Sequence, residues 1–337
     1  MELRAEIPYF FWADAPITRH NMFPGQAVVT SDDNFSTAPP VDEGPATQPR
    51  LRQKVAGWLS AAITPVAARV GRDLIGGETL DDAWAVVTRL ERQGLDYTLG
   101  FWDTSDYSLH DVTDVYRAAL DRISDHGGKG YVSIKPPALR FDPGIARDLA
   151  ARSLATNVRL HCDSHGEDQA DATFRFANAL AAGAAPHLVS VTIPARWTRS
   201  LSDADRMASE GVGVRIVKGQ WPDLTGPGVG MEAGFLALAD RLAGRGGWLA
   251  IATHDHGLLT AAVERLKRAG ASFDQEFILG VARPATFAAA SSNGAPVRIY
   301  VPYGKGFIPN ALGTLRRNPR LALGVAMQLL PFRRKVA

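Results

Sequence analysis

The chain has 337 residues, of which 46% are hydrophobic and 21% are charged, a composition typical of a globular protein with one large domain or two ordinary ones. A net charge of +2, without a dense run of lysine and arginine, argues against a nucleic-acid-binding protein. Cys162 is the only cysteine, which excludes an internal disulfide and a Cys-X-X-Cys metal site. We therefore expect a reducing, cytoplasmic setting.

The N-terminal part of the chain divides into two regions. Residues 1–50 are rich in proline, aspartate, serine and threonine and show little periodicity, so we expect an irregular arm. The arm lacks the continuous apolar core of a signal peptide, and no stretch of about 18 apolar residues predicts a membrane span. Residues 51–93 repeat apolar side chains at spacings of three and four, which predicts lead-in helices, the last of them capped by Thr79.

From residue 94 to about residue 330, short apolar runs alternate with amphipathic helical patterns. Continuously apolar strands separated by helices predict a parallel sheet, and eight such units predict an α/β protein with a closed (β/α)8 barrel. A doubly wound open sheet is the alternative, but the glycine-rich turn that would favour it is missing after the first strand. The expected strands are YTLGFW (97–102), GYVSIK (130–135), NVRLHC (157–162), HLVSVTI (187–193), GVRIVK (213–218), WLAIAT (248–253), QEFILG (275–280) and VRIYVP (297–302).

Polar side chains gather at the expected carboxyl ends of these strands, where barrel enzymes place their chemistry. One rim of the barrel would then carry cations, carboxylates, a phenol and an imidazole, and this combination predicts a functional site. Any one of these residues taken alone could be an ordinary rim residue. In HCDSH (161–165) we expect the histidine at 161 and the aspartate at 163 on one side of a strand and the second histidine in a loop, so we predict no metal site. The predicted rim residues are Lys135, Asp163, Arg215, Lys218, Thr253, His254, Glu276 and Tyr300.

Three motifs that follow one another in order carry a family resemblance: VRIVKG (214–219), ATH (252–254) and RIYVPYG (298–304). Over roughly residues 70–325 the chain resembles the proline dehydrogenase family. The resemblance implies a flavoprotein barrel that binds FAD, oxidises L-proline to pyrroline-5-carboxylate and serves proline metabolism. We expect a divergent member that acts on proline or on a related cyclic or N-substituted amino acid.

The resemblance also implies roles for individual residues. Arg215 would reach flavin N5, where a permanent cation stabilises the negative charge that develops during hydride transfer. On the substrate side, Lys135 and Asp163 could form a buried pair, and Tyr300 would pack on the substrate and bond Asp163 through its hydroxyl. The residues implied to contact the cofactor are Arg215, Lys218, Gly219, Thr253, His254 and Glu276.

The C-terminal stretch VPYGKGFIPNALGTLRRNPR departs from the family pattern, in which a tyrosine precedes an Arg-Arg pair that clamps the substrate carboxylate. Matching the arginines directly makes Arg316 and Arg317 the clamp and puts Gly313 at the tyrosine position. An ungapped match puts Asn310 at the tyrosine position, Gly313 and Thr314 at the arginine positions and Arg317 at a glutamate position. The ungapped match is slightly preferred, because a three-residue insertion would rotate a helix by about 300°. Both matches remain open, as does an exposed helix face carrying the two arginines.

Other departures from the family pattern lead to alternative functional hypotheses. Pro194 replaces a family glutamine that bonds the flavin ring, and GPGVGMEAGF (226–235) lacks the lysine expected near the adenine end. Since both alignments remove the bulky pocket tyrosine, we expect a larger pocket and predict tolerance for a substrate larger than proline, such as a hydroxylated or ring-modified one. A barrel that binds flavin or another ligand without turnover is the second hypothesis, and a metal-dependent lyase is the third.

The segment LALGVAMQLLPFRRKVA ends the chain with an apolar run followed by basic residues. We favour a packed terminal helix with a solvated basic end. The alternative is peripheral contact with the inner face of a membrane, where a quinone could accept electrons. The expected partners are otherwise limited to a small amino-acid substrate.

Overall fold

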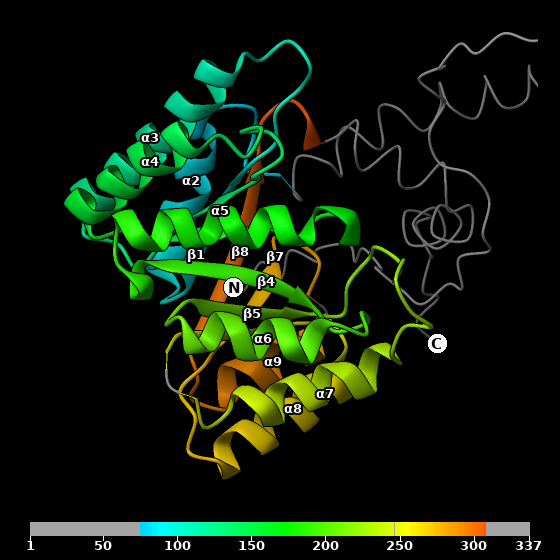
Figure 1. Cartoon of the computed structure of the whole chain (residues 1–337). Helices are drawn as coiled ribbons and strands as arrows, with labels where there is room; N and C mark the ends of the chain where they lie inside the picture. Colours follow the sequence, from blue (N-terminus) through cyan, green and yellow to red (C-terminus); the bar gives the residue numbers. More distant parts are fainter. Residues whose placement is uncertain (1–74, 246, 283, 308–337) are drawn as a thin grey trace, which may run out of the picture. The chain divides into compact units, whose positions relative to one another are not determined.

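The computed structural model describes residues 75–245, 247–282 and 284–307, which are coloured in Figure 1. Within them, parallel strands β1 to β8 pair in sequence order and close into a barrel. The predicted (β/α)8 fold is therefore confirmed, and the open doubly wound sheet is excluded. The expected irregular arm, the helices expected over residues 51–74, and Arg316 and Arg317 lie outside the described residues.

The strands pair in parallel around the whole barrel, and β8 closes it by pairing with β1. All eight agree with the expected apolar runs to within a few residues. Their interior and exterior faces are both covered, which is why they read as continuous apolar segments. The strands are β1 (Asp96–Phe101), β2 (Tyr131–Ile134), β3 (Leu160–Cys162), β4 (Val189–Pro194), β5 (Gly213–Val217), β6 (Leu249–Ala252), β7 (Asp274–Ile278) and β8 (Val297–Tyr303).

Helices surround the strands, with α2 to α5 on one side of the barrel and α6 to α9 on the other (Figure 1). Helices α2 to α8 bury apolar side chains against the barrel, whereas α9 buries Thr286 and Ala290. The helices are α2 (Leu80–Arg92), α3 (Leu109–His126), α4 (Pro143–Thr156), α5 (Ala170–Gly183), α6 (Ser200–Ser209), α7 (Met231–Leu242), α8 (His256–Arg268) and α9 (Pro284–Ser292), with short 3-10 turns η1 (Glu167–Gln169) and η2 (Pro186–Leu188).

The helix starts follow from local side-chain chemistry. Thr79 caps α2 as predicted: its hydroxyl accepts from the Asp82 amide, and the Asp82 carboxylate accepts from the Thr79 amide. Ser108 and Asp111 repeat this reciprocal arrangement at α3. Such capping boxes satisfy backbone N–H groups that a first turn leaves without partners.

None of the described helices combines the length and apolarity needed to cross a bilayer. The core is a continuous layer of aliphatic and aromatic side chains between the strands and the helices. The barrel interior is different, because it also contains several buried charged residues, among them Arg215, Glu276 and Arg298.

Candidate active site

Arg215 lies at the centre of a buried polar cluster inside the barrel. It comes from β5 and is only 6% exposed. Its Nη1 donates to Glu276 on β7 at 2.6 Å, and its Nη2 donates to Asp163, which follows β3. Nε and Nη2 both donate to Thr192 Oγ1 on β4, at 3.2 and 2.9 Å. Burial alone would lower the pKa of Arg215, but the two carboxylates outweigh it and raise this pKa well above its ordinary value, so the charge is permanent.

His161 fixes the direction of the Thr192 hydroxyl. Its ring is fully buried, with Nε2 2.7 Å from Thr192 Oγ1 and Nδ1 2.8 Å from Ser190 Oγ. Because the Thr192 oxygen already accepts from Arg215, its proton is directed to His161 Nε2. Nδ1 is then the protonated nitrogen and donates to Ser190. Burial holds the pKa of His161 well below its ordinary value, so the ring stays neutral.

Tyr300 and Asp163 make the contact that the sequence predicts. The Tyr300 hydroxyl donates to Asp163 Oδ2 at 3.3 Å, and its ring lies 5.7 Å from Arg215 Cζ. Gly100 on β1 makes room for this ring, since a Cβ there would overlap the Tyr300 hydroxyl. Burial raises the pKa of Asp163, but Arg215 and Lys135 outweigh it and hold this pKa at about 2. Asp163 is therefore an anion at neutral pH.

Lys135 follows β2 and is 8% exposed. Lys135 and Asp163 are coupled through their charges, as expected of a buried pair, but they make no direct ion pair. Lys135 Nζ donates instead to the Phe101 carbonyl and lies 4.3 Å from the centre of the Trp102 ring, while Asp163 pairs with Arg215. The carbonyl and the aromatic face hold the ammonium where the carboxylate was expected to do so. Burial lowers the pKa of Lys135 to about 8, against the opposing charge of Asp163.

The cofactor-side residues expected from the resemblance follow β5 and β6. Lys218 Nζ lies 3.2 Å from the carboxylate of Asp255, which caps α8. Thr253 is buried, and its hydroxyl accepts from the Asp255 amide at 3.2 Å. His254 Nδ1 is buried without a hydrogen-bond partner among the described residues, and burial lowers the pKa of this imidazole to about 4. Gly219 has a φ of +92°, a conformation that favours glycine.

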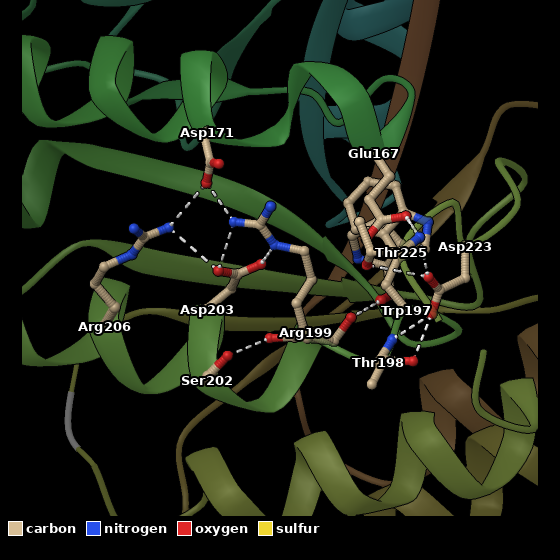
Figure 2. A network of polar contacts seen from close by, with 12 residues as sticks. Glu167, Asp171, Trp197, Thr198, Arg199, Ser202, Asp203, Arg206, Asp223 and Thr225 are labelled. Atoms are coloured by element: carbon tan, nitrogen blue, oxygen red, sulfur yellow. Dashed lines mark hydrogen bonds and ion pairs between the residues drawn. The ribbon is translucent and has the colours of Figure 1, made fainter. Parts of the chain in front are cut away.

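A polar network anchors the connection between β5 and α7 (Figure 2). The Trp197 indole N–H points at the carbonyls of residues 221 and 222, at 3.1 and 3.2 Å. Asp223 accepts from the amide and hydroxyl of Thr198, both at 2.7 Å. The buried carboxylate of Glu167, on η1, accepts from the amide of Thr225 at 3.2 Å and from its hydroxyl at 2.6 Å. The segment after Lys218 is thus tied to the two preceding strand–helix connections.

Three predicted rim residues lie inside their strands rather than at the ends. Arg215 is the third residue of β5, Glu276 the third of β7 and Tyr300 the fourth of β8. The structure therefore joins Asp163, Arg215, Glu276 and Tyr300 in a cluster that extends into the barrel, and Lys135 acts on this cluster through its charge. Lys218, Thr253 and His254 do lie just beyond strand ends, as predicted.

Sequence reasoning did not assign roles to several residues of the cluster. Ser190 and Thr192 occupy alternate positions on β4, and His161 and Asp163 occupy alternate positions on the segment through β3. Alternate residues of a strand point to the same face, so this spacing could have indicated that the four side chains face the barrel interior together. Tyr131 donates its hydroxyl to Glu276 Oε2 across the barrel, a partnership that the sequence does not reveal. Over the described ranges, no group of three or more His, Cys, Asp or Glu side chains is arranged to hold a metal ion.

Comparison with known proteins identifies relatives of the chain. Proline dehydrogenase 1 of Bacillus subtilis strain 168 is 22% identical over 282 residues, which cover 77% of this chain and 90% of that protein. Its counterpart in Bacillus subtilis subsp. natto is 23% identical over the same shares. The chain is a divergent relative of the proline dehydrogenases. This finding confirms the resemblance carried by VRIVKG, ATH and RIYVPYG. No family model matches the chain.

Solved structures of proline utilization A share the fold. The protein from Bdellovibrio bacteriovorus, inactivated by N-propargylglycine, superimposes with a TM-score of 0.63 at 18% identity, covering 80% of this chain and 34% of that one. A mutant of the Bradyrhizobium japonicum protein gives a TM-score of 0.61 at 21% identity, with 83% and 34% covered. The chain thus spans about a third of the length of these solved chains.

Proposed function

We propose that the protein is an FAD-dependent oxidoreductase that acts on the CH–NH bond of L-proline or of a related cyclic or N-substituted amino acid and forms an imine. The observation that carries the proposal is the buried Arg215 guanidinium, held by Asp163, Glu276 and Thr192 inside a barrel whose sequence relatives are proline dehydrogenases. A permanent cation at this position suits a reaction in which negative charge develops beside it.

The residues after β5 and β6 fit a polar, planar cofactor. His254 Nδ1 and Trp221 Nε1 are buried polar atoms without partners among the described residues, and such atoms ordinarily find one. At Gly219 a Cβ would lie 2.7 Å from Pro194 Cβ, so the backbone passes close to the end of β4. We propose that Arg215, Lys218, Gly219, Thr253 and His254 hold FAD. When bound, FAD would supply the hydride acceptor.

The side chains on the substrate side would orient the amino acid. Asp163 is an anion and Lys135 is a cation below about pH 8, so the site offers both charges that an amino acid needs. We propose that Lys135 attracts the substrate carboxylate and that the ring of Tyr300 packs against the substrate. Arg316 and Arg317 remain candidates for a second carboxylate contact. Because the stretch before Arg316 lacks the tyrosine of the family pattern, we propose that the pocket tolerates substrates larger than proline.

The experiment is spectroscopic. Purified protein, reconstituted with FAD under anaerobic conditions, is mixed with proline, hydroxyproline or pipecolate, and bleaching of the flavin band is followed. We expect bleaching, with tolerance for the larger or hydroxylated rings. Arg215→Met should lower the bleaching rate by about 100-fold or more, because one preorganised charge contributes that much, whereas Arg152→Met, on the exposed face of α4, should leave it unchanged.

Two results would overturn parts of the proposal. A colourless protein that takes up no added FAD would favour the barrel without turnover, which the replacement of the flavin-bonding glutamine by Pro194 motivates. Strict preference for unmodified proline would contradict the enlarged pocket.

We further propose that a quinone accepts the electrons, which steady-state turnover with a soluble quinone analogue tests.

A further inference from the structure

Glu276 carries an inference about how Arg215 works, which rests on the proposed function. We propose that Glu276 is a positioning residue: it aims the remaining donor of Arg215 and offsets part of its charge, rather than contacting the cofactor itself. This replaces the role that the family resemblance implies for Glu276.

The hydrogen bonds of Arg215 define what Glu276 controls. A guanidinium has five N–H groups in one plane. Four have acceptors here: one on Nη1, two on Nη2 and the one on Nε. The second N–H of Nη1 has no acceptor within the described part of the chain. Glu276 accepts from the first N–H of Nη1 at 2.6 Å. Because both N–H groups belong to one planar nitrogen, this carboxylate also sets the direction in which the second N–H points.

The carboxylate of Glu276 is itself fixed from the opposite side. The Tyr131 hydroxyl donates to Oε2, while Arg215 takes Oε1. Burial raises the pKa of Tyr131, so its hydroxyl remains a donor at any ordinary pH. The Tyr131 ring in turn lies 4.7 Å from Arg298 Cζ, and Arg298 is anchored to Asp274 at 2.9 Å. A chain of buried contacts therefore runs from the barrel framework to the free N–H of Arg215.

Charge gives Glu276 a second effect. The buried cation of Arg215 faces two carboxylates, those of Asp163 and Glu276, so its field is partly cancelled. In a weakly screened interior, neutralising one carboxylate would leave the guanidinium distinctly more positive. A more positive guanidinium would favour the reduced, more negative form of a bound flavin. Glu276 should thus keep the flavin harder to reduce than Arg215 alone would make it.

Two substitutions separate geometry from charge. Glu276→Gln keeps the shape and removes the charge, whereas Glu276→Asp keeps the charge and withdraws the carboxylate. By dye-coupled redox titration, we expect Glu276→Gln to favour reduced over oxidised bound flavin by about tenfold or more. Glu276→Asp and Tyr131→Phe should leave this ratio near that of the wild type. A merely structural residue would move stability in all three variants and the redox equilibrium in none, and that result would overturn the charge effect.

The cofactor-free protein provides the second readout and separates this inference from the proposed function. In arginine-labelled protein, NMR should show slowly rotating Arg215 Nη groups, assigned by their loss in Arg215→Lys. Glu276→Gln and Glu276→Asp should both speed the rotation at Nη1 by about tenfold or more, since a charge-assisted bond is weakened or lost. Unchanged rotation in both would overturn the positioning role even if FAD binds. If the wild type takes up no FAD, the proposed function fails, while the NMR result still decides whether Glu276 positions Arg215.

Discussion

Lys135 shows how a single residue can link the structure to a pH dependence. Its pKa is lowered to about 8 by burial, so it loses its charge within the range in which the protein can be assayed. If the charged form attracts a carboxylate, binding should weaken as the pH rises through 8. We predict that the Kd of cyclopentanecarboxylate, a ring carboxylate without an amine, increases about tenfold between pH 7 and pH 9.

Calorimetric titration at several pH values tests this prediction. The amine-free probe is chosen because a substrate amine would add its own titration. In Lys135→Gln the affinity should be lower and nearly constant across the same range, since His254, with a pKa of about 4, does not titrate there. A wild-type profile that stays flat between pH 7 and pH 9 would remove Lys135 from the carboxylate site.

Which single contacts could be foreseen depends on whether a recognised sequence motif carries both partners. The contact between Tyr300 and Asp163 followed from the family pattern and is present. Lys135 and Asp163 make no direct ion pair, because a backbone carbonyl and an indole ring, which no motif encodes, hold the ammonium. Tyr131 was not assigned a role, since no motif links it to Glu276, which lies 145 positions away in the sequence.

At the scale of elements, the connection between β5 and α7 depends on a carboxylate from another connection. Glu167 is only 4% exposed and accepts from the amides of Leu224 and Thr225 and from the Thr225 hydroxyl. An amide has one acceptor oxygen in place of two and adds donors with no acceptor nearby. We predict that Glu167→Gln accelerates hydrogen exchange at the amides of Leu224 and Thr225 by about tenfold, corresponding to about 1.4 kcal/mol of local opening.

Mass-spectrometric or NMR exchange measurements would check this effect. Amides within β4 and β5 should exchange as in the wild type, because their ladder bonds are untouched. Glu232→Gln, at an exposed position in the first turn of α7, serves as the matched control. Equal acceleration throughout the barrel would mean that Glu167 supports global stability and not this connection.

The elements themselves were largely predictable, for local reasons. Apolar β-branched runs located the strands, and Thr79 located the start of α2 through a hydrogen bond to a residue three positions away. The depth of the site was misjudged, although the expected strand ranges contained it. Arg215 and Glu276 were expected at strand ends, but they are the third residues of β5 and β7, close to their places in the predicted runs 213–218 and 275–280.

For the whole molecule, closure of the barrel places a buried cation where β8 meets β1 and β7. Arg298 is 5% exposed, ion-pairs with Asp96 and Asp274, and donates to the carbonyls of Tyr97 and Lys129 at 2.8 Å. Removing the cation would leave two partly buried carboxylates and two carbonyls without their donor. We predict that Arg298→Met lowers the free energy of unfolding by about 3–5 kcal/mol, measured by urea denaturation at pH 7.

The pH dependence of this loss distinguishes a missing charge from a packing defect. Burial raises the pKa of Asp96 above its unfolded value, and loss of Arg298 would raise it further. The folded variant then binds protons more readily than its unfolded chain, so its stability should increase as the pH falls. The gap between Arg298→Met and the wild type should narrow between pH 7 and pH 5. Arg152→Met, which removes the exposed pair with Asp121, should leave the free energy of unfolding nearly unchanged. A gap that stays constant with pH would assign the loss to packing, because only a buried, titrating carboxylate can make it shrink.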